Sequence, residues 1–354
     1  MKDNRTFIRV PALAAALVVA LLLLVGTYTV IASPAPRAAA ASPGDSSSAT
    51  AWSSGWVPLV AGTPRLFNHN LGGDPDDYAV EVWFRDTTPS GAGINRRVYG
   101  GLESGGSWFG AFWEHLTSNT ISVHRFPNDQ TADEVFVRVW VVPSAADYDS
   151  GWQNIAAGTT EVFTHGLGIT ATDLTVGLWF SGTVRGIHHH AFGGLAVDGP
   201  QLLLGAHWHN LTDNSVQVTR HLDDTDVEQV RVVVLQGDPP DYDSLVALGG
   251  WQFVAQDQKF TFAHNLNWNP SMMLVRAECY DPVAGGINLW LAGGNVKGWP
   301  PGGAKGANLQ NLTANAVDVY RWPNDDVCPE ARVRIWKRSA LLYLPLVVSN
   351  YTAP

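Results

Sequence analysis

The sequence predicts an all-β protein made of three tandem antiparallel β-sandwich modules of about seven strands each. The first observation is a stretch that occurs three times, at 110–129, 205–224 and 306–325. The second is the spacing of three histidines in similar contexts, His69, His165 and His264, which lie 96 and then 99 residues apart. The third is composition, because 45% hydrophobic and 15% charged residues with 35 glycines and 15 tryptophans are typical of compact β-modules.

Each copy of the repeated stretch predicts a β-hairpin followed by an arginine-containing loop. In the first copy, GAFWEHLTSNTISVHRFPND, a strand-like run ends at Leu-Thr, and Ser118-Asn119 supplies a turn. A second run then alternates apolar and polar residues up to Arg125. The other two copies keep this order and end at Arg220 and Arg321. We therefore expect the same hairpin in every module.

The other strands are predicted in the same order in all three modules. A Gly-Trp pair begins each module, a long alternating strand follows the histidine, the next strand starts after Gly-Ile, and a final strand comes after the hairpin. The long strands start near Ala79, Leu174 and Met273, and the final strands start near Val135, Val230 and Ala331. A period of about a hundred residues is too long for a solenoid repeat and fits a sandwich domain.

These landmarks place the modules at 52–143, 148–237 and 247–338. The linkers between them are short and carry a nearly repeated DYDS. Short linkers leave little reach between modules, so we expect a compact arrangement and not a string.

The N-terminus carries the features of an export signal. Lys2, Arg5 and Arg9 precede an apolar run from Pro11 to Ile31. Residues 1–32 are therefore predicted to be a cleaved signal peptide or an uncleaved membrane anchor. Either outcome puts the folded part outside the cytoplasm, secreted or attached to the cell surface, and contact with the membrane is expected only through this segment if it is uncleaved.

Two further segments lie outside the modules. Residues 33–51 are mostly Ala, Pro, Ser and Gly, a composition typical of a flexible linker. Residues 339–354 form an apolar tail, for which an added edge strand and a surface-attachment signal are both open.

Cys279 and Cys328 are the two cysteines of the chain. An exported protein with two cysteines most simply pairs them, so we predict a disulfide between a core strand and the loop after Arg321. Neither residue belongs to a Cys-x-x-Cys motif, which argues against a catalytic thiol.

The charge balance argues against nucleic acid as a partner. The net charge is -10, and clustered lysines and arginines that could neutralise phosphates do not occur. Enzyme signatures such as G-x-S-x-G, a P-loop or a dinucleotide fingerprint are also absent from the sequence. Because threefold repetition argues against a single active site, we predict that the chain is not an enzyme.

The order of the landmarks resembles the H-type lectin domain of snail and slime-mould agglutinins. The resemblance rests on the initial Gly-Trp, the Phe-x-His-x-Leu turn before the long strand, the hairpin ending in an aromatic-polar loop, and the final Val-Arg-Val-x-Trp strand. It covers each module almost from end to end. It implies a sandwich that assembles as a trimer and binds N-acetylgalactosamine or related sugars at sites shared between subunits. Three tandem copies would form that trimer within one chain, as an intramolecular pseudo-trimer.

The resemblance also implies positions for a sugar site. A Trp-His pair follows the second hairpin strand in the family, and the matching positions here hold Arg125-Phe126, Arg220-His221 and Arg321-Trp322. An acidic residue in the loop after Gly-Trp helps to hold the sugar, and the third module alone offers one, Asp257.

Two interpretations of the loop after each hairpin are open. A sugar site needs an aromatic surface with fixed hydrogen-bonding groups around it, which the loop residues can supply. Alternatively, each arginine clamps its own loop through the carboxylate four residues on. The candidate ligand contacts are Arg321, Trp322, Asn324, Asp325 and Asp257 in the third module, Arg125, Phe126, Asn128 and Asp129 in the first, and Arg220, His221, Asp223 and Asp224 in the second.

Four histidines of the second module form a separate candidate site. Alternation puts His188 and His190 on one face of the strand after Gly-Ile, and His207 and His209 on one face of the first hairpin strand. If these strands are neighbours, the imidazoles can reach ligand distance for zinc or copper. The alternative is a solvated polar face, and no other cofactor is predicted.

The favoured function is carbohydrate binding outside the cell, in glycan recognition or adhesion. One alternative is a structural spacer of the cell surface without a ligand. A less favoured alternative is a hydrolase acting on glycosides, because paired carboxylates leave no sequence signature.

Overall fold

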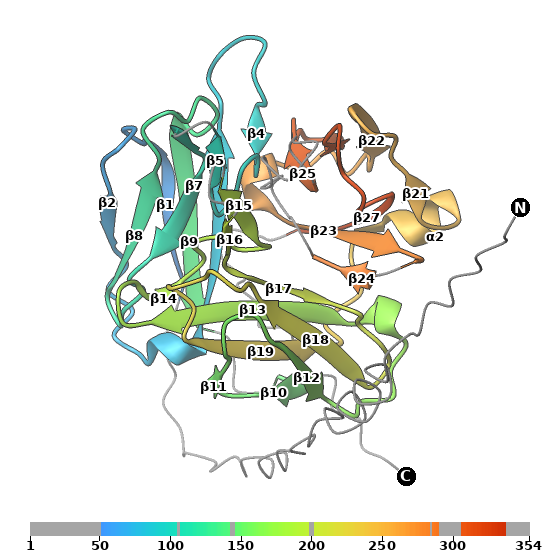
Figure 1. The fold of residues 1–354 in the computed structure, drawn as a ribbon. Helices are drawn as coiled ribbons and strands as arrows, with labels where there is room; N and C mark the ends of the chain where they lie inside the picture. The colour runs from blue at the N-terminus through green and yellow to red at the C-terminus, as the bar shows by residue number, and fades with distance from the viewer. Residues whose placement is uncertain are drawn as a thin grey trace, which may run out of the picture. The chain divides into compact units, whose positions relative to one another are not determined.

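The computed structural model describes residues 51–104, 107–141, 146–197, 202–283, 285–289 and 306–337. The predicted export segment, nearly all of the linker and the C-terminal tail lie outside these residues. The described chain is all-β and consists of several antiparallel sheets (Figure 1). Within it, no helix combines the length and the apolar character needed to cross a membrane.

The three modules are called repeats 1, 2 and 3 in chain order. Repeat 1 forms two antiparallel sheets and a two-stranded ribbon. The larger sheet has the order β1-β9-β3-β4, the smaller sheet has the order β2-β8-β7, and β5 pairs with β6. The elements, with the short 3₁₀ helix η1, are β1 (Ala51–Pro58), β2 (Arg65–Asn68), η1 (Pro75–Asp77), β3 (Tyr78–Arg85), β4 (Ile94–Asn95), β5 (Leu102–Ser104), β6 (Ser107–Phe109), β7 (Ala111–Glu114), β8 (Thr120–Arg125) and β9 (Glu134–Val141).

Repeat 2 has the same plan. Its larger sheet follows β10-β19-β13-β14 with β11 also on β19, its smaller sheet follows β12-β18-β17, and β15 pairs with β16. The elements are β10 (Tyr148–Asp149), β11 (Gln153–Asn154), β12 (Thr160–Thr164), η2 (Ala171–Asp173), β13 (Thr175–Gly182), β14 (Gly186–His188), β15 (Leu195–Val197), β16 (Leu202–Leu204), β17 (Ala206–His209), β18 (Ser215–Arg220) and β19 (Gln229–Leu235).

Repeat 3 forms the corresponding two sheets and adds one short helix, and its first strand, β20, lies before the predicted module start at residue 247, because the DYDS segment pairs with β27. The sheets follow β20-β27-β23-β24, with β21 also on β27, and β22-β26-β25. The elements are β20 (Tyr242–Asp243), α2 (Ser244–Leu248), β21 (Gln252–Phe253), β22 (Gln258–Ala263), η3 (Pro270–Met272), β23 (Met273–Asp281), β24 (Gly286–Asn288), β25 (Ala307–Gln310), β26 (Ala316–Arg321) and β27 (Glu330–Lys337).

The three predicted hairpins are confirmed. Their strands pair in the same register, which starts at Ala111 opposite Arg125 in repeat 1. The recurring Leu-Thr is explained by the turn, because the hydroxyl of Thr117 accepts hydrogen bonds from the amides of Asn119 and Thr120. The equivalent threonines of the other two hairpins make the same contacts.

Apolar side chains fill the space between the two sheets of each repeat. In repeat 1, Val82 and Phe84 of the larger sheet belong to the same buried cluster as Trp113, Ile121 and Val123 of the smaller sheet. Each such side chain stabilises the fold by about 1.5–3 kcal/mol relative to an exposed one. This arrangement is consistent with a β-sandwich.

Strands of different repeats also exchange backbone hydrogen bonds. The strand after Gly-Ile neighbours the hairpin strand of another repeat: β4 lies beside β25, β14 beside β7, and β24 beside β17. In each case the amide after the short strand donates to a carbonyl of the hairpin strand, and the amide of a hairpin leucine donates back. The bonds are Arg96 to Leu309 at 2.9 Å, His189 to Trp113 at 3.0 Å, Leu289 to Trp208 at 3.1 Å, Leu312 to Ile94 at 3.0 Å, Leu116 to Ile187 at 3.2 Å and Leu211 to Ile287 at 3.2 Å.

Candidate functional site

The arginine at the end of each hairpin is part of a clamp within its own loop. Its Nε donates to the carboxylate four residues on, and its Nη2 donates to the backbone carbonyl of that same residue. Its Nη1 donates to the carbonyl of Leu59, Ile155 or Val254. The Nε–Oδ2 distances are 3.0 Å for Arg125–Asp129, 2.9 Å for Arg220–Asp224 and 2.7 Å for Arg321–Asp325.

The carboxylate of each clamp also ties the loop to the start of the hairpin. In repeat 1, Asp129 accepts hydrogen bonds from the amides of Gly110, Thr131 and Ala132. Glycine is required at position 110, because its φ is 85° and an added Cβ would lie 2.0 Å from the carbonyl oxygen of Val98. The clamp interpretation therefore accounts for the recurrence of both charged residues in the loop.

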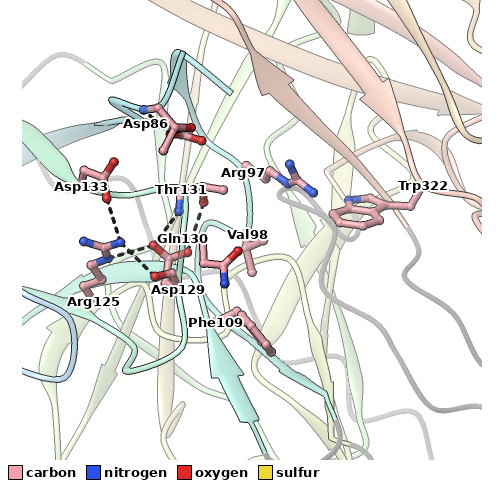
Figure 2. A pocket seen from close by; sticks show the side chains of 11 residues that line it. Asp86, Arg97, Val98, Phe109, Arg125, Asp129, Gln130, Thr131, Asp133 and Trp322 are labelled. Atoms are coloured by element: carbon pink, nitrogen blue, oxygen red, sulfur yellow. Dashed lines mark hydrogen bonds and ion pairs between the residues drawn. The ribbon is translucent and has the colours of Figure 1, made fainter. Parts of the chain in front are cut away.

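A hollow of about 660 Å³ opens beside the clamp of repeat 1 (Figure 2). Repeat 3 contributes the aromatic ring of Trp322 to it, and repeat 1 contributes the other lining residues. These are Asp86, Thr88, Arg97, Val98, Phe109, Arg125, Asp129, Gln130, Thr131 and Asp133. The structure thus brings Arg125 and Asp129 of the first predicted loop and Trp322 of the third to one hollow between two repeats.

The feature that joins the two repeats at this hollow is a cation on an aromatic ring. The guanidinium carbon of Arg97 lies 5.3 Å from the centre of the Trp322 ring, and Figure 2 shows the two side chains facing each other. Within the described residues, the guanidinium of Arg97 has no hydrogen-bond or ion-pair partner. The indole Nε1 of Trp322 is buried and has no acceptor among those residues. The guanidinium of Arg97 therefore has donors left for a further partner.

The carboxylates of the hollow are already engaged. Asp86 accepts from the amides of Thr88 and Ala92, and Asp129 belongs to the clamp. Asp133 accepts from Thr87 and from Arg125. Burial alone would raise the pKa of Asp133, but the hydrogen bonds from Thr87 and the charge of Arg125 outweigh it and lower that pKa. These oxygens are fixed acceptors.

Asp257 lies next to the hollow through one intervening side chain. Its Oδ1 accepts a hydrogen bond of 2.7 Å from the hydroxyl of Tyr320, whose ring packs edge-on against Trp322. Burial and this hydrogen bond raise the pKa of Tyr320 to about 12, so the hydroxyl stays a donor. Asp257 has a φ of 56°, and the corresponding positions in the other repeats are glycines with positive φ, Gly62 and Gly158.

The corresponding loops of repeats 1 and 2 present no comparable ring. Phe126 is buried and packs against Trp108 and Phe112 at 5.2 and 5.3 Å. His221 is buried against His207, and burial lowers its pKa to about 4. The remaining predicted ligand residues are distributed differently: Asn128, Asn324 and Asp223 do not line the hollow, and the first two are exposed.

The four histidines of repeat 2 fall into two pairs. His190 lies 2.7 Å from a carboxylate oxygen of Asp226. The rings of His207 and His209 lie 5.2 Å apart in a tilted arrangement, and His209 contacts Thr219. The strands of the two pairs do not pair with each other, because each has a strand of another repeat beside it. Among the residues that the structure describes, no group of three or more His, Cys, Asp or Glu is placed to hold a metal ion.

His188 occupies a position that asparagine holds in the other repeats. Its Nδ1 accepts from the amide of His190, and its Nε2 donates to the carbonyl of Asp226. Asn95 makes the same two contacts, since its Oδ1 accepts from the amide of Arg97 and its Nδ2 donates to the carbonyl of Thr131. The two ring nitrogens of His188 thus take the places of an amide oxygen and an amide nitrogen.

Cys279 and Cys328 form a disulfide that joins β23 to the loop before β27, with the two Cα atoms 4.9 Å apart. Both residues are buried. The bridge lies beside the clamp of repeat 3, because the amide of Cys328 donates to Asp325.

No protein-family model matches the sequence, and comparison with curated proteins and with solved structures gives no match either. The interpretation of the site therefore depends on the residues themselves.

Proposed function

We propose that the three repeats close into one intramolecular pseudo-trimer. The support is the cyclic order of the backbone hydrogen bonds, in which repeat 1 bonds to repeat 2, repeat 2 to repeat 3, and repeat 3 to repeat 1 through equivalent residues. A string of modules has no contact between its first and last members. Small-angle scattering tests the arrangement, since a maximum dimension above about three domain diameters would exclude the closed form.

On this basis, we propose that the chain binds carbohydrate in the hollow between repeats 3 and 1. The observation that carries the proposal is the pairing of Trp322 from one repeat with Arg97 from another at the edge of a polar hollow of about 660 Å³. A sugar presents a C–H face that stacks on an aromatic ring, and hydroxyls that need donors and acceptors around it. Trp322 is the stacking surface, Arg97 and the exposed Gln130 are donors, and Asp133 is an acceptor.

The resemblance of the sequence landmarks to H-type lectins supports the same proposal independently of the hollow. It implies sugar sites shared between neighbouring subunits and an acidic residue near the aromatic ring. Trp322 and Arg97 come from different repeats, and Asp257 is linked to Trp322 through Tyr320. N-acetylgalactosamine and related sugars are therefore the first ligands to test.

Binding is favoured over hydrolysis at this hollow. A glycoside hydrolase needs one carboxyl with a raised pKa as an acid and a second as a nucleophile or base. Here Asp86 and Asp129 hold backbone amides, and the pKa of Asp133 is lowered. We propose that the protein acts outside the cell, where its predicted export segment would send it and where a disulfide persists.

A glycan array with the secreted protein tests the proposal. The test variant is Trp322→Ala, and the control is Trp268→Ala, which removes another tryptophan of repeat 3 that also has a cation, Lys337, over its ring. We expect at least a tenfold loss of binding to the best glycan for Trp322→Ala and no change for Trp268→Ala, with both variants folded by circular dichroism. No glycan bound by the wild type, or equal binding by Trp322→Ala, would exclude this site.

A further inference from the structure

A second cavity, of about 130 Å³, lies where the three repeats meet. Equivalent strands of the repeats supply apolar lining residues, Val82 from β3, Leu178 from β13 and Ala277 from β23. The volume is large enough for a few water molecules or one small ion. Its polar lining decides between these occupants.

Arg276 lines this cavity without a partner. Its guanidinium makes no hydrogen bond or ion pair with any residue that the structure describes, although the side chain is partly buried. In the β23–β27 pairing it lies directly opposite another arginine, Arg334. Like charges at opposite positions of a sheet repel each other, so the pair needs a compensating negative charge.

The carboxylates nearby are already shared among other arginines. Glu81 pairs with Arg96 and Arg138, with nitrogen–oxygen distances of 3.2 and 3.5 Å. Glu278, which also lines the cavity, pairs with Arg332 and Arg334. A partly buried arginine without a carboxylate is stabilised when another anion joins it.

Among the described residues that line the cavity, two are arginines, Arg96 and Arg276, and one is a carboxylate, Glu278. Burial lowers the pKa of Arg96 to about 10 against the effect of Glu81, and the charge of Arg276 acts in the same direction as burial. His189, also in the lining, has a pKa well below its ordinary value because of burial, so it adds no charge.

The open polar groups of the cavity are donors. Asn308 is 4% exposed, its Oδ1 accepts from Gln310, and its Nδ2 has no hydrogen-bond partner among the described residues. The hydroxyl of Tyr99 and the imidazole of His189 are bonded to each other at 2.9 Å. A cation or an apolar ligand would leave the donors of Arg276 and Asn308 unsatisfied, whereas an anion would satisfy them.

We infer that this cavity binds one small anion, of the size of chloride or bromide, between Arg276 and Asn308. Because residues of all three repeats line the cavity, the anion stabilises the contact between repeats. The inference does not depend on carbohydrate binding, since the cavity shares no lining residue with the hollow at Trp322.

Thermal unfolding at constant ionic strength tests the inference, with chloride replaced stepwise by gluconate, which is too large for the cavity. We expect the Tm of the wild type to rise with chloride concentration, because a ligand that binds only the folded state stabilises it. In Arg276→Met this dependence is lost. The control Arg65→Met removes an arginine outside the cavity, and its Tm should still rise with chloride concentration. A wild-type Tm independent of chloride, as expected for a cavity that holds water alone, would overturn the inference, as would an undiminished dependence in Arg276→Met.

Diffraction gives a second test that needs no variant. Crystals of the wild type grown or soaked in bromide should show an anomalous peak inside the cavity, within hydrogen-bond distance of Arg276. Bromide peaks on the protein surface alone would contradict the inference.

Discussion

Arg97 of repeat 1 and Trp322 of repeat 3 face each other across a boundary between repeats, with 5.3 Å between the guanidinium carbon and the ring centre. Neither residue completes the site within its own repeat. The proposed ligand site therefore exists only when the two repeats are in contact, and its aromatic surface and its cationic donor can be changed independently.

Arg97→Ala should weaken glycan binding at least tenfold, because the variant loses a donor beside the stacking surface. It should also lower the free energy of unfolding by about 0.5–1 kcal/mol, the usual strength of an exposed cation–π contact. Glycan binding is measured by titration calorimetry and stability by urea unfolding. Arg65→Ala is the matched control, since Arg65 lies 5.5 Å above Phe67 within repeat 1. Equal loss of glycan affinity in both variants would show that Arg97 has no direct role in the site.

Asp325→Asn should destabilise the protein by about 3–5 kcal/mol, because it breaks a buried pair and leaves Arg321 without its counter-ion. The free energy of unfolding in urea measures this. Asn324→Ala, at the exposed neighbouring position, should change it by less than about 0.5 kcal/mol. If Asp325→Asn cost no more than Asn324→Ala, the clamp would not support the loop.

The hairpins could be predicted from the sequence because each depends on local signals. Alternation up to Arg125, the turn at Ser118-Asn119 and the Leu-Thr before it all act within one short stretch. Three copies of the same signals also fix the strand order of the repeats. The clamp was one of two interpretations for the same reason, since Arg125 and Asp129 are four residues apart.

The hollow could not be predicted, because its parts are far apart in the sequence. Arg97 and Trp322 meet because β4 lies beside β25, which no local pattern indicates. Gln130 and Asp133 carry no signal that separates them from other loop residues. The sequence places asparagine at the position of His188 in the other repeats, but a ring that replaces both ends of an amide is visible only from its hydrogen bonds.

Removal of the disulfide should destabilise repeat 3. The bridge closes a loop with a sequence separation of 49, and loss of such a constraint on the unfolded chain corresponds to about 4 kcal/mol. The double variant Cys279→Ala, Cys328→Ala avoids unpaired buried thiols and should unfold at a lower urea concentration than the oxidised wild type. The reduced wild type should fall between them or match the variant. An unchanged midpoint would mean that the bridge adds no stability to this fold.

The buried histidines should make stability depend on pH. Burial lowers the pKa of His188 to about 3 and that of His221 to about 4, below the ordinary value of 6.5. At pH values between the lowered pKa and 6.5, the unfolded chain binds protons that the folded chain does not. The free energy of unfolding therefore falls as pH falls below about 6.5. Each such histidine contributes about 1.4 kcal/mol per pH unit to this slope.

His188→Asn isolates one of these contributions, because asparagine in repeat 1 makes the same pair of hydrogen bonds. The variant should match the wild type within about 1 kcal/mol at pH 7.5, where the histidine is neutral in both states. Between pH 6 and pH 5, its free energy of unfolding should fall less steeply than that of the wild type, by about 1.4 kcal/mol per pH unit. Urea unfolding at half-unit pH steps measures both slopes. Identical slopes would show that His188 is protonated in the folded protein, and a large loss of stability at pH 7.5 would show that its two nitrogens do more than replace an amide.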